Sequence, residues 1–109
     1  MQLTETEDGK YWIIAVAGDV DASSSIHLDQ AIEDALSAGK QHILIDGTKM
    51  QYIASAGLGV FVSRIEEFKD KQIHFAIFGL NDRVKNVFQI LGLDKLLSIV
   101  ADLKQAKAT

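Results

Sequence analysis

The chain has 109 residues, of which 48% are hydrophobic and 24% charged, as in an ordinary globular protein, and we expect residues 1–109 to form one domain. Its 11 basic and 15 acidic side chains give a net charge of −4, which disfavours binding to nucleic acid and to anionic membranes. There is no cysteine for a disulfide or thiolate site, no apolar run near the roughly 20 residues of a membrane span and no signal peptide, so we expect a cytoplasmic protein.

The hydrophobic pattern predicts strands and helices in the order β-β-α-β-α-β-α-(β)-α. The expected strands are residues 2–7, 11–17, 42–46, 72–78 and 96–100, and the expected helices are residues 24–38, 56–69, about 82–91 and 101–107. An Asp8-Gly9 turn joins the first two strands as a hairpin. The strand–helix–strand segment over residues 42–78 predicts parallel pairing. The fold class is therefore α/β, with a mixed sheet of about four to five strands packed with about four helices.

The strand over residues 42–46 is almost wholly apolar, which is typical of a central parallel strand covered on both faces. A polar turn over residues 46–51 follows, and then the stretch Tyr52-Ile53-Ala54-Ser55-Ala56-Gly57-Leu58-Gly59. Ser55 lies where the strand changes to a helix, among small residues that do not shield it. The first amides of a helix lack intrahelical partners and carry partial positive charge. A hydroxyl there is either a helix cap or a site that favours a negative group.

No set of residues has the pattern of a catalytic site, so we expect no enzyme, no cofactor and no metal. A nucleophile elbow requires glycine two residues before the serine, and that position is Ile53. Gly57-Leu58-Gly59 lacks the further glycine or lysine of a phosphate-binding loop. The three histidines are scattered along the chain at no metal-ligand spacing, and structural or surface roles suit them: His27, His42 and His74.

Two polar segments follow neighbouring predicted strands and are the candidates for a binding surface. They are residues 19–25 and 52–59, both rich in small and hydroxyl side chains. Asp19, Asp21 and Asp46 could gather there as an acidic cluster, although Asp19 and Asp21 also suit a turn and a cap. Because ligands and partners meet a parallel sheet beyond the carboxyl ends of its strands, we expect a partner-binding face that carries one exposed serine.

Four short motifs, in order and across nearly the whole chain, resemble the STAS domain, the fold of bacterial anti-sigma factor antagonists. They are Gly18-Asp19-Val20-Asp21, Ile43-Leu44-Ile45-Asp46, the stretch of residues 52–59, and the segment from Arg83-Val84 to Leu91-Gly92-Leu93. In the family, the third motif is roughly an apolar residue followed by Asp-Ser-Ser/Thr-Gly-Leu-Gly. Each motif alone is weak, but their order and spacing together are specific for the fold.

The resemblance implies a switch in transcription regulation. In such antagonists a GHKL-type serine kinase, which is also the anti-sigma factor, binds the unphosphorylated protein and phosphorylates the serine that matches Ser55. A metal-dependent serine phosphatase restores the binding form. The Asp21 position and the residues around Leu58 match the partner-facing surface of the family. Together with the segment of residues 19–25, this predicts a partner-binding surface of Asp19, Asp21, Ser23, Ser24, Ser55, Ala56, Gly57 and Leu58.

The chain departs from the family motif on both sides of Ser55. The family aspartate is Ala54 here, and the residue after the serine is Ala56. Ser55 is therefore the only hydroxyl of the motif, while the missing acid bears on capping and on kinase recognition. Two other functions stay open: a constitutive STAS scaffold that is not cycled by phosphorylation, and a small-molecule or nucleotide sensor, although no motif requires a ligand.

Overall fold

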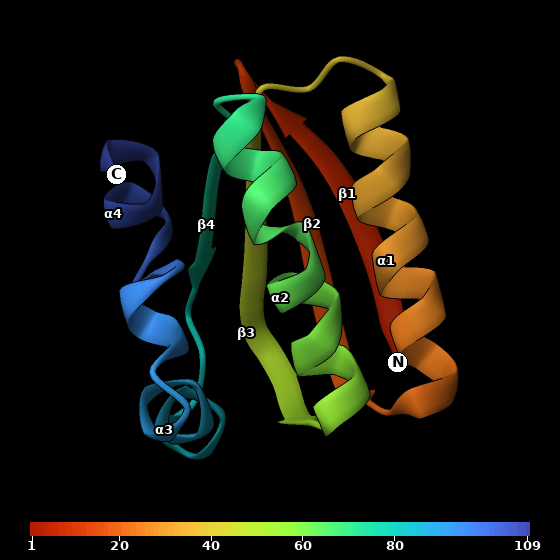
Figure 1. Ribbon diagram of the computed structural model, residues 1–109, viewed down its shortest axis with the longest axis vertical. Coiled ribbons are helices and arrows are strands. Elements are labelled where there is room, and N and C mark those ends of the chain that lie inside the picture. Colours follow the sequence, from red (N-terminus) through yellow and green to blue (C-terminus); the bar gives the residue numbers. More distant parts are fainter.

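The five strands pair in the order in which they occur in the sequence, in a computed structural model that describes residues 1–109 (Figure 1). The strands are β1 (Gln2–Asp8), β2 (Tyr11–Val20), β3 (His42–Ile53), β4 (His74–Phe78) and β5 (Ser98–Val100). The helices are α1 (Ala22–Ser37), α2 (Ser55–Asp70), α3 (Asp82–Ile90) and α4 (Leu103–Ala108), with a 3-10 turn η1 (Leu93–Lys95). β1 is antiparallel to β2, and the other neighbours are parallel. The predicted α/β class, element order and mixed sheet are confirmed.

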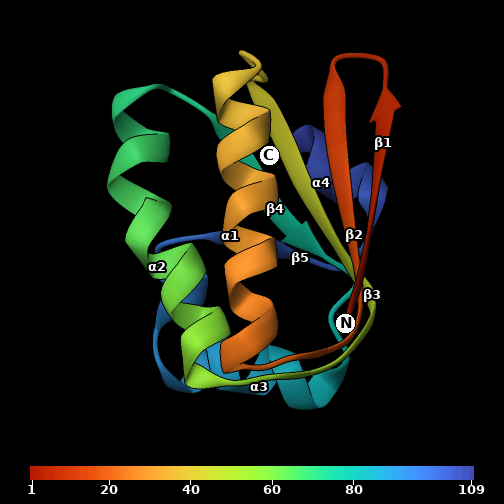
Figure 2. The ribbon, with the colours of Figure 1, turned by 90° about the vertical axis from the view of Figure 1, so that its right-hand side faces the viewer.

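Helices cover both faces of the sheet (Figure 2). The main core of 21 buried residues lies under α1, α2 and α3, and a smaller cluster lies under α4 on the opposite face. β3 contributes Ile43 and Ile45 to the main core and Leu44 to the smaller cluster. It is therefore covered on both faces, as its apolar sequence predicts. No helix combines the length and the apolar character needed to cross a bilayer.

The predicted polar turn over residues 46–51 is wrong, because β3 continues through it to Ile53. β2 likewise runs three residues past its predicted end, to Val20, and pairs with the second half of β3. The Asp46 carboxylate accepts hydrogen bonds from the Thr48 amide at 3.0 Å and the Thr48 hydroxyl at 2.7 Å. This local turn coincides with a register shift between the strands, so the extra residue becomes a bulge and the ladder resumes.

The remaining boundaries differ from the prediction in ways that have local causes. Gln72 has φ +54°, a turn conformation, so β4 begins at His74 instead of residue 72. The last predicted strand is shorter, because residues 93–95 form η1 before β5. Three of the four helices begin at a side chain that accepts a backbone N–H: Asp21, Asn81 and Asp102. Helix α2 is the exception.

Candidate functional site

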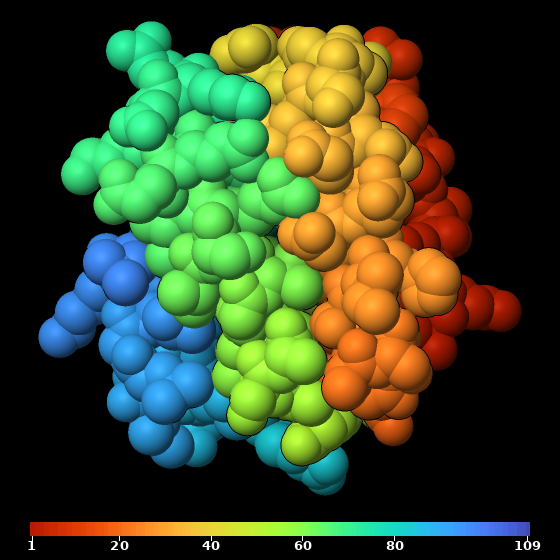
Figure 3. All heavy atoms as spheres, turned by 45° about the vertical axis from the view of Figure 1, so that its right-hand side comes forward, coloured from red at the N-terminus to blue at the C-terminus, as the bar shows by residue number.

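The two predicted binding segments lie side by side, because β2 and β3 are parallel neighbours that end at the same edge. Asp19 pairs with Tyr52, and the Ala54 amide donates to the Val20 carbonyl at 2.8 Å. Helices α1 and α2 therefore start next to each other, as the orange and yellow-green atoms in Figure 3 show. We call the surface formed by residues 19–25 and 52–59 the helix-start face.

Ser55 is not the cap of α2. Ala54 holds that position with an extended backbone, φ −84° and ψ 169°, and its methyl group accepts no hydrogen bond. The interpretation of Ser55 as a helix cap is therefore wrong. Ser55 is the first helical residue, its side chain is exposed, and its hydroxyl has no hydrogen-bonding partner within the protein. It stands in the first turn of a helix whose amides no side chain caps, a position with partial positive charge.

Asp21 supplies a fixed negative charge at the start of the neighbouring helix. Its carboxylate accepts from the Ser24 amide at 2.9 Å and from the Ser23 hydroxyl at 2.8 Å. The Asp21 amide donates in return to the Ser24 hydroxyl at 2.9 Å, which completes a capping box. The Ser24 amide, followed by the hydroxyls of Ser23 and Ser24, lowers the pKa of Asp21 to about 2. The carboxylate is thus ionised at neutral pH, and both serines are engaged in capping.

The other predicted partner residues divide between the surface and the core. Asp19 and Ala56 are exposed, whereas Gly57 and Leu58 are buried. Asp46 lies within β3 and contacts Thr48, away from the edge where β3 ends, so the three aspartates do not form an acidic cluster.

The two glycines of α2 have opposite surroundings, which predicts opposite effects of alanine. A Cβ at Gly57 would lie 2.7 Å from side-chain carbons of both Ile53 and Val20, whereas one at Gly59 would meet nothing within 4 Å. We expect Gly57→Ala to lower the free energy of unfolding by about 1–3 kcal/mol through overpacking. We expect Gly59→Ala to raise it by about 0.5–1 kcal/mol, because alanine is the better helix former. Urea denaturation of the matched pair measures both values, and equal shifts would contradict the packing around Gly57.

Three side chains at or beside the helix-start face were not in the predicted set of partner-binding residues, although Tyr52 begins the second predicted segment. Ile26 in α1 is 68% exposed and borders a shallow hollow with Ala56 and Gly59 between the helices. Tyr52 is 49% exposed and shares a second hollow with Asp19 and Arg83. At helical spacing Ile26 does not fall on the apolar stripe of α1, so its exposure could have been predicted from the sequence. The position of Arg83 near Tyr52 depends on how α3 packs against the sheet, and a local sequence pattern does not predict that packing.

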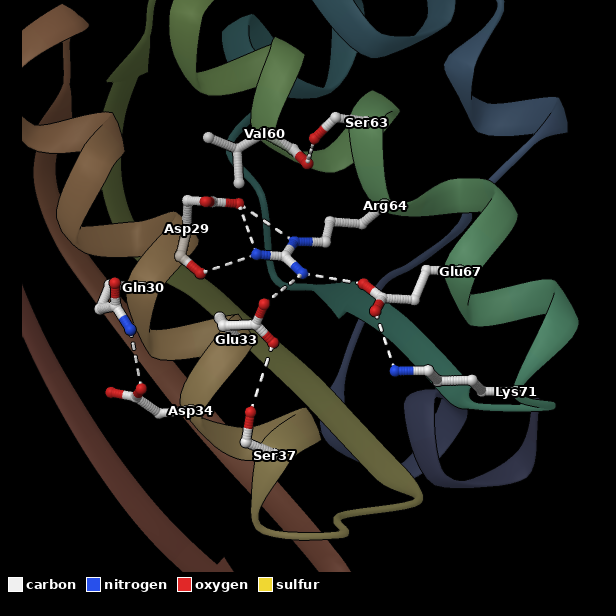
Figure 4. A network of polar contacts seen from close by, with 10 residues as sticks. All are labelled: Asp29, Gln30, Glu33, Asp34, Ser37, Val60, Ser63, Arg64, Glu67 and Lys71. Atoms are coloured by element: carbon white, nitrogen blue, oxygen red, sulfur yellow. Dashed lines mark hydrogen bonds and ion pairs between the residues drawn. The ribbon is translucent and has the colours of Figure 1, made fainter.

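Arg64 connects α1 and α2 further along the same pair of helices (Figure 4). Its guanidinium lies 3.0 Å from Asp29, 3.6 Å from Glu33 and 2.8 Å from Glu67. Burial opposes its charge, but the hydrogen bonds to Glu67 and Asp29 outweigh burial and raise its pKa. One half-buried cation therefore holds three carboxylates from two helices.

The histidines are less scattered than the sequence suggests. His27 is exposed on α1, but His42 and His74 are cross-strand neighbours whose Nδ1 atoms lie 2.9 Å apart. The prediction of scattered histidines is wrong for this pair, because the register of β3 against β4 brings the two rings together. No group of three or more potential ligands lies close enough to hold a metal ion.

Comparison with known proteins decides the family. The family model for the STAS domain matches residues 2–106. The chain belongs to the STAS domain family. A relative from Listeria monocytogenes, named anti-sigma-B factor antagonist, is 35% identical over 86 residues, which are 79% of this chain and 75% of the relative.

Solved structures agree on the fold of this STAS domain. The crystal structure of an anti-sigma factor antagonist from Mycobacterium paratuberculosis superposes with a TM-score of 0.89 at 19% identity, over 98% of this chain and 91% of that one. The phosphorylated form of the Bacillus cell fate determinant SpoIIAA superposes with a TM-score of 0.74 at 17% identity, over 98% and 97%. The name of the relative from Listeria monocytogenes describes a regulator of another protein, an anti-sigma factor.

Proposed function

We propose that this STAS domain is an anti-sigma factor antagonist. Its partner is an anti-sigma factor that is also a GHKL-type serine kinase, and phosphorylation of Ser55 ends the binding. The observation that carries the proposal is the exposed, unbonded hydroxyl of Ser55 at the start of α2, beside the fixed carboxylate of Asp21. The 35% identical relative bears the name of such an antagonist, and SpoIIAA has been solved in a phosphorylated form.

The position of Ser55 suits a phosphate without any change of fold. A phosphoserine carries about −1.5 to −2 charges at neutral pH. At a helix N-terminus that charge is tolerated, or stabilising by about 0.3–2 kcal/mol. The side chain at Ala54 accepts no first-turn amide, so no cap competes with the phosphate. Phosphorylation therefore acts at the interface, by its bulk and by repulsion from acidic or closely packed groups of the partner.

In this proposal the helix-start face and the adjoining Ile26 meet the kinase. Ile26 and Tyr52 are the exposed apolar contacts, and Asp21 is a fixed charge. A metal-dependent serine phosphatase removes the phosphate and restores binding. The cycle takes place in the cytoplasm, where sigma factors act.

The direct test is incubation of the protein with its candidate kinase and ATP, followed by mass spectrometry. We expect a gain of one phosphate located at Ser55 and none in Ser55→Ala. Ser23→Ala is the matched control, because it removes a nearby hydroxyl that is engaged by Asp21, and it should still be phosphorylated. A phosphate on any other residue would contradict the assignment of Ser55.

The alternative is a constitutive STAS scaffold that binds its partner without a phosphorylation cycle. Ala54 favours this alternative, because it takes the place of the acid that precedes the phosphorylated serine in the family motif. The two functions differ in one observable. A protein that binds the kinase tightly but gains no phosphate at Ser55 is the scaffold, and restoring the acid with Ala54→Asp tests whether that residue alone makes the difference.

A further inference from the structure

His42 and His74 occupy the first positions of β3 and β4 and face each other on the side of the sheet that α4 covers. Their Nδ1 atoms are 2.9 Å apart. The Nε2 atom of His74 lies 2.9 Å from the carbonyl oxygen of Ala106 in α4 and 2.8 Å from the hydroxyl of Thr109. The pair thus links two strands to the C-terminal helix.

The acceptors determine where the hydrogens of the pair lie. A carbonyl oxygen only accepts, so the Nε2 atom of His74 carries a hydrogen and donates it to Ala106. In the neutral ring the Nδ1 atom of His74 is then bare and accepts from the Nδ1–H of His42. The hydrogen bonds run in one direction, from His42 to His74 to α4.

This chain of hydrogen bonds tolerates one extra proton but not two. The first proton adds to Nε2 of His42 and leaves the shared hydrogen bond intact. The second must add to Nδ1 of His74, where the hydrogen of His42 already points, and it would place two N–H groups of two cations 2.9 Å apart.

Charged groups of both signs lie near the pair. Tyr11 of β2 packs edge-on against both rings, and Lys10 and Lys107 lie 5.5 and 5.3 Å from the centre of the Tyr11 ring. Asp8 of β1 is paired with Lys107 at 2.7 Å. Burial, followed by Lys10 and His74, lowers the pKa of His42.

Helix α4 depends on these polar contacts because it buries little apolar surface. It contributes Ala106 and the partly buried Leu103 to the cluster with Leu44, Ala76 and Phe78. Its other anchors are the Tyr11 hydroxyl, which donates to the Lys107 carbonyl at 3.2 Å, and the Lys107–Asp8 pair. A short element with few apolar contacts is the kind that opens locally.

We propose that His42 and His74 form a pH-sensitive latch, which releases α4 from the sheet when both rings are protonated. Release exposes the apolar side chains of Leu44 and Phe78, which are otherwise buried. His42 and His74 begin β3 and β4, and these strands begin at the end of the sheet opposite to the starts of α1 and α2 (Figure 1). The latch is therefore independent of the proposed function. The unfolded chain binds protons at the ordinary histidine pKa of about 6.5, above the lowered value of His42, so docking weakens as the pH falls.

The test is hydrogen exchange of the α4 amides by NMR, expressed as protection factors, across the acidic range below neutrality. Below the ordinary histidine pKa of about 6.5, we expect protection in α4 to fall by about tenfold for each pH unit, the slope of a one-proton linkage, while β2 and β3 keep theirs. We also expect ring-nitrogen shifts at neutral pH to show hydrogen on Nε2 of His74. A pH-independent α4, or hydrogen on Nδ1 of neutral His74, would overturn the proposal.

A pair of variants separates the latch from general acid destabilisation. His42→Asn keeps an amide donor near Nδ1 of His74, and the amide can turn its oxygen to a protonated His74, so α4 should stay docked in acid. His27→Asn removes an exposed histidine of α1 and should leave the wild-type pH dependence unchanged. If His42→Asn loses α4 at the same pH as the wild type, the latch is wrong. Should that variant not fold, the wild-type exchange and ring-nitrogen data decide alone.

Discussion

Ser55→Asp should bind the kinase about 30-fold to 1,000-fold more weakly than the wild type, a loss of about 2–4 kcal/mol, because like charges brought together at an interface cost several kcal/mol. Ser55→Ala should bind as the wild type does, because the hydroxyl makes no hydrogen bond within the protein. Isothermal titration with the purified kinase measures both affinities.

Ser55→Asp should not lower the free energy of unfolding, and this separates an effect on the interface from an effect on folding. Ser55 is exposed in the first turn of α2, where a carboxylate gains about 0.3–1 kcal/mol from the helix dipole. Ser37→Asp is the matched control, because it adds the same charge to an exposed serine at the far end of α1 and should leave binding intact. If Ser55→Asp binds as tightly as Ser55→Ala, the proposed switch is wrong.

Arg64→Met should lower the free energy of unfolding by about 1–3 kcal/mol, the range for charge-assisted hydrogen bonds lost to a half-buried group. Methionine keeps much of the apolar length of the side chain and removes the charge. Asp29, Glu33 and Glu67 would then share a site without the cation that lies 2.8 to 3.6 Å from each of them. The carboxylates are 44%, 47% and 29% exposed, so solvent screening keeps the loss below that of a fully buried network. Urea denaturation at low and high salt measures it.

Lys71→Met is the control for Arg64→Met. Lys71 contacts Glu67 at 2.9 Å, one turn away on the same helix, and its side chain is 54% exposed. Such a pair contributes about 0.3–0.5 kcal/mol and is screened by salt. An Arg64→Met variant no less stable than Lys71→Met would mean that the link between α1 and α2 contributes nothing beyond an ordinary surface pair.

The contact between His42 and His74 could not be predicted from local sequence patterns. Each histidine opens an apolar strand, and the sequence alone suggests isolated structural roles. The two residues are 32 positions apart, and only the register of β3 against β4 brings their rings into contact. The Arg64–Asp29 contact spans 35 positions and has the same origin, because it depends on how two helices lie over the sheet.

The prediction that β3 ends in a turn at residues 46–51 was wrong for a related reason. Asp46 to Gln51 is polar enough to resemble a turn, and a local turn does form at Asp46 and Thr48. The strand nevertheless continues, because β2 extends to Val20 and supplies the partner for its ladder, while Met50 and Ile53 point into the core. Pairing with a distant segment outweighed the local preference.

The sequence by itself determined the α/β class, the order of the elements and the position of Ser55 at the start of α2. Hydrophobic periodicity and the placement of glycines are local patterns within windows of a few residues, so these features can be predicted from the sequence. The tertiary structure decided that Ala54, which has no capping side chain, occupies the N-cap position of α2, and that Ser23 and Ser24 are engaged by Asp21. It also decided that Ile26 and Tyr52 are exposed at or beside the helix-start face. Those facts depend on register, helix packing and the approach of distant segments, which arise only when the whole sheet has assembled.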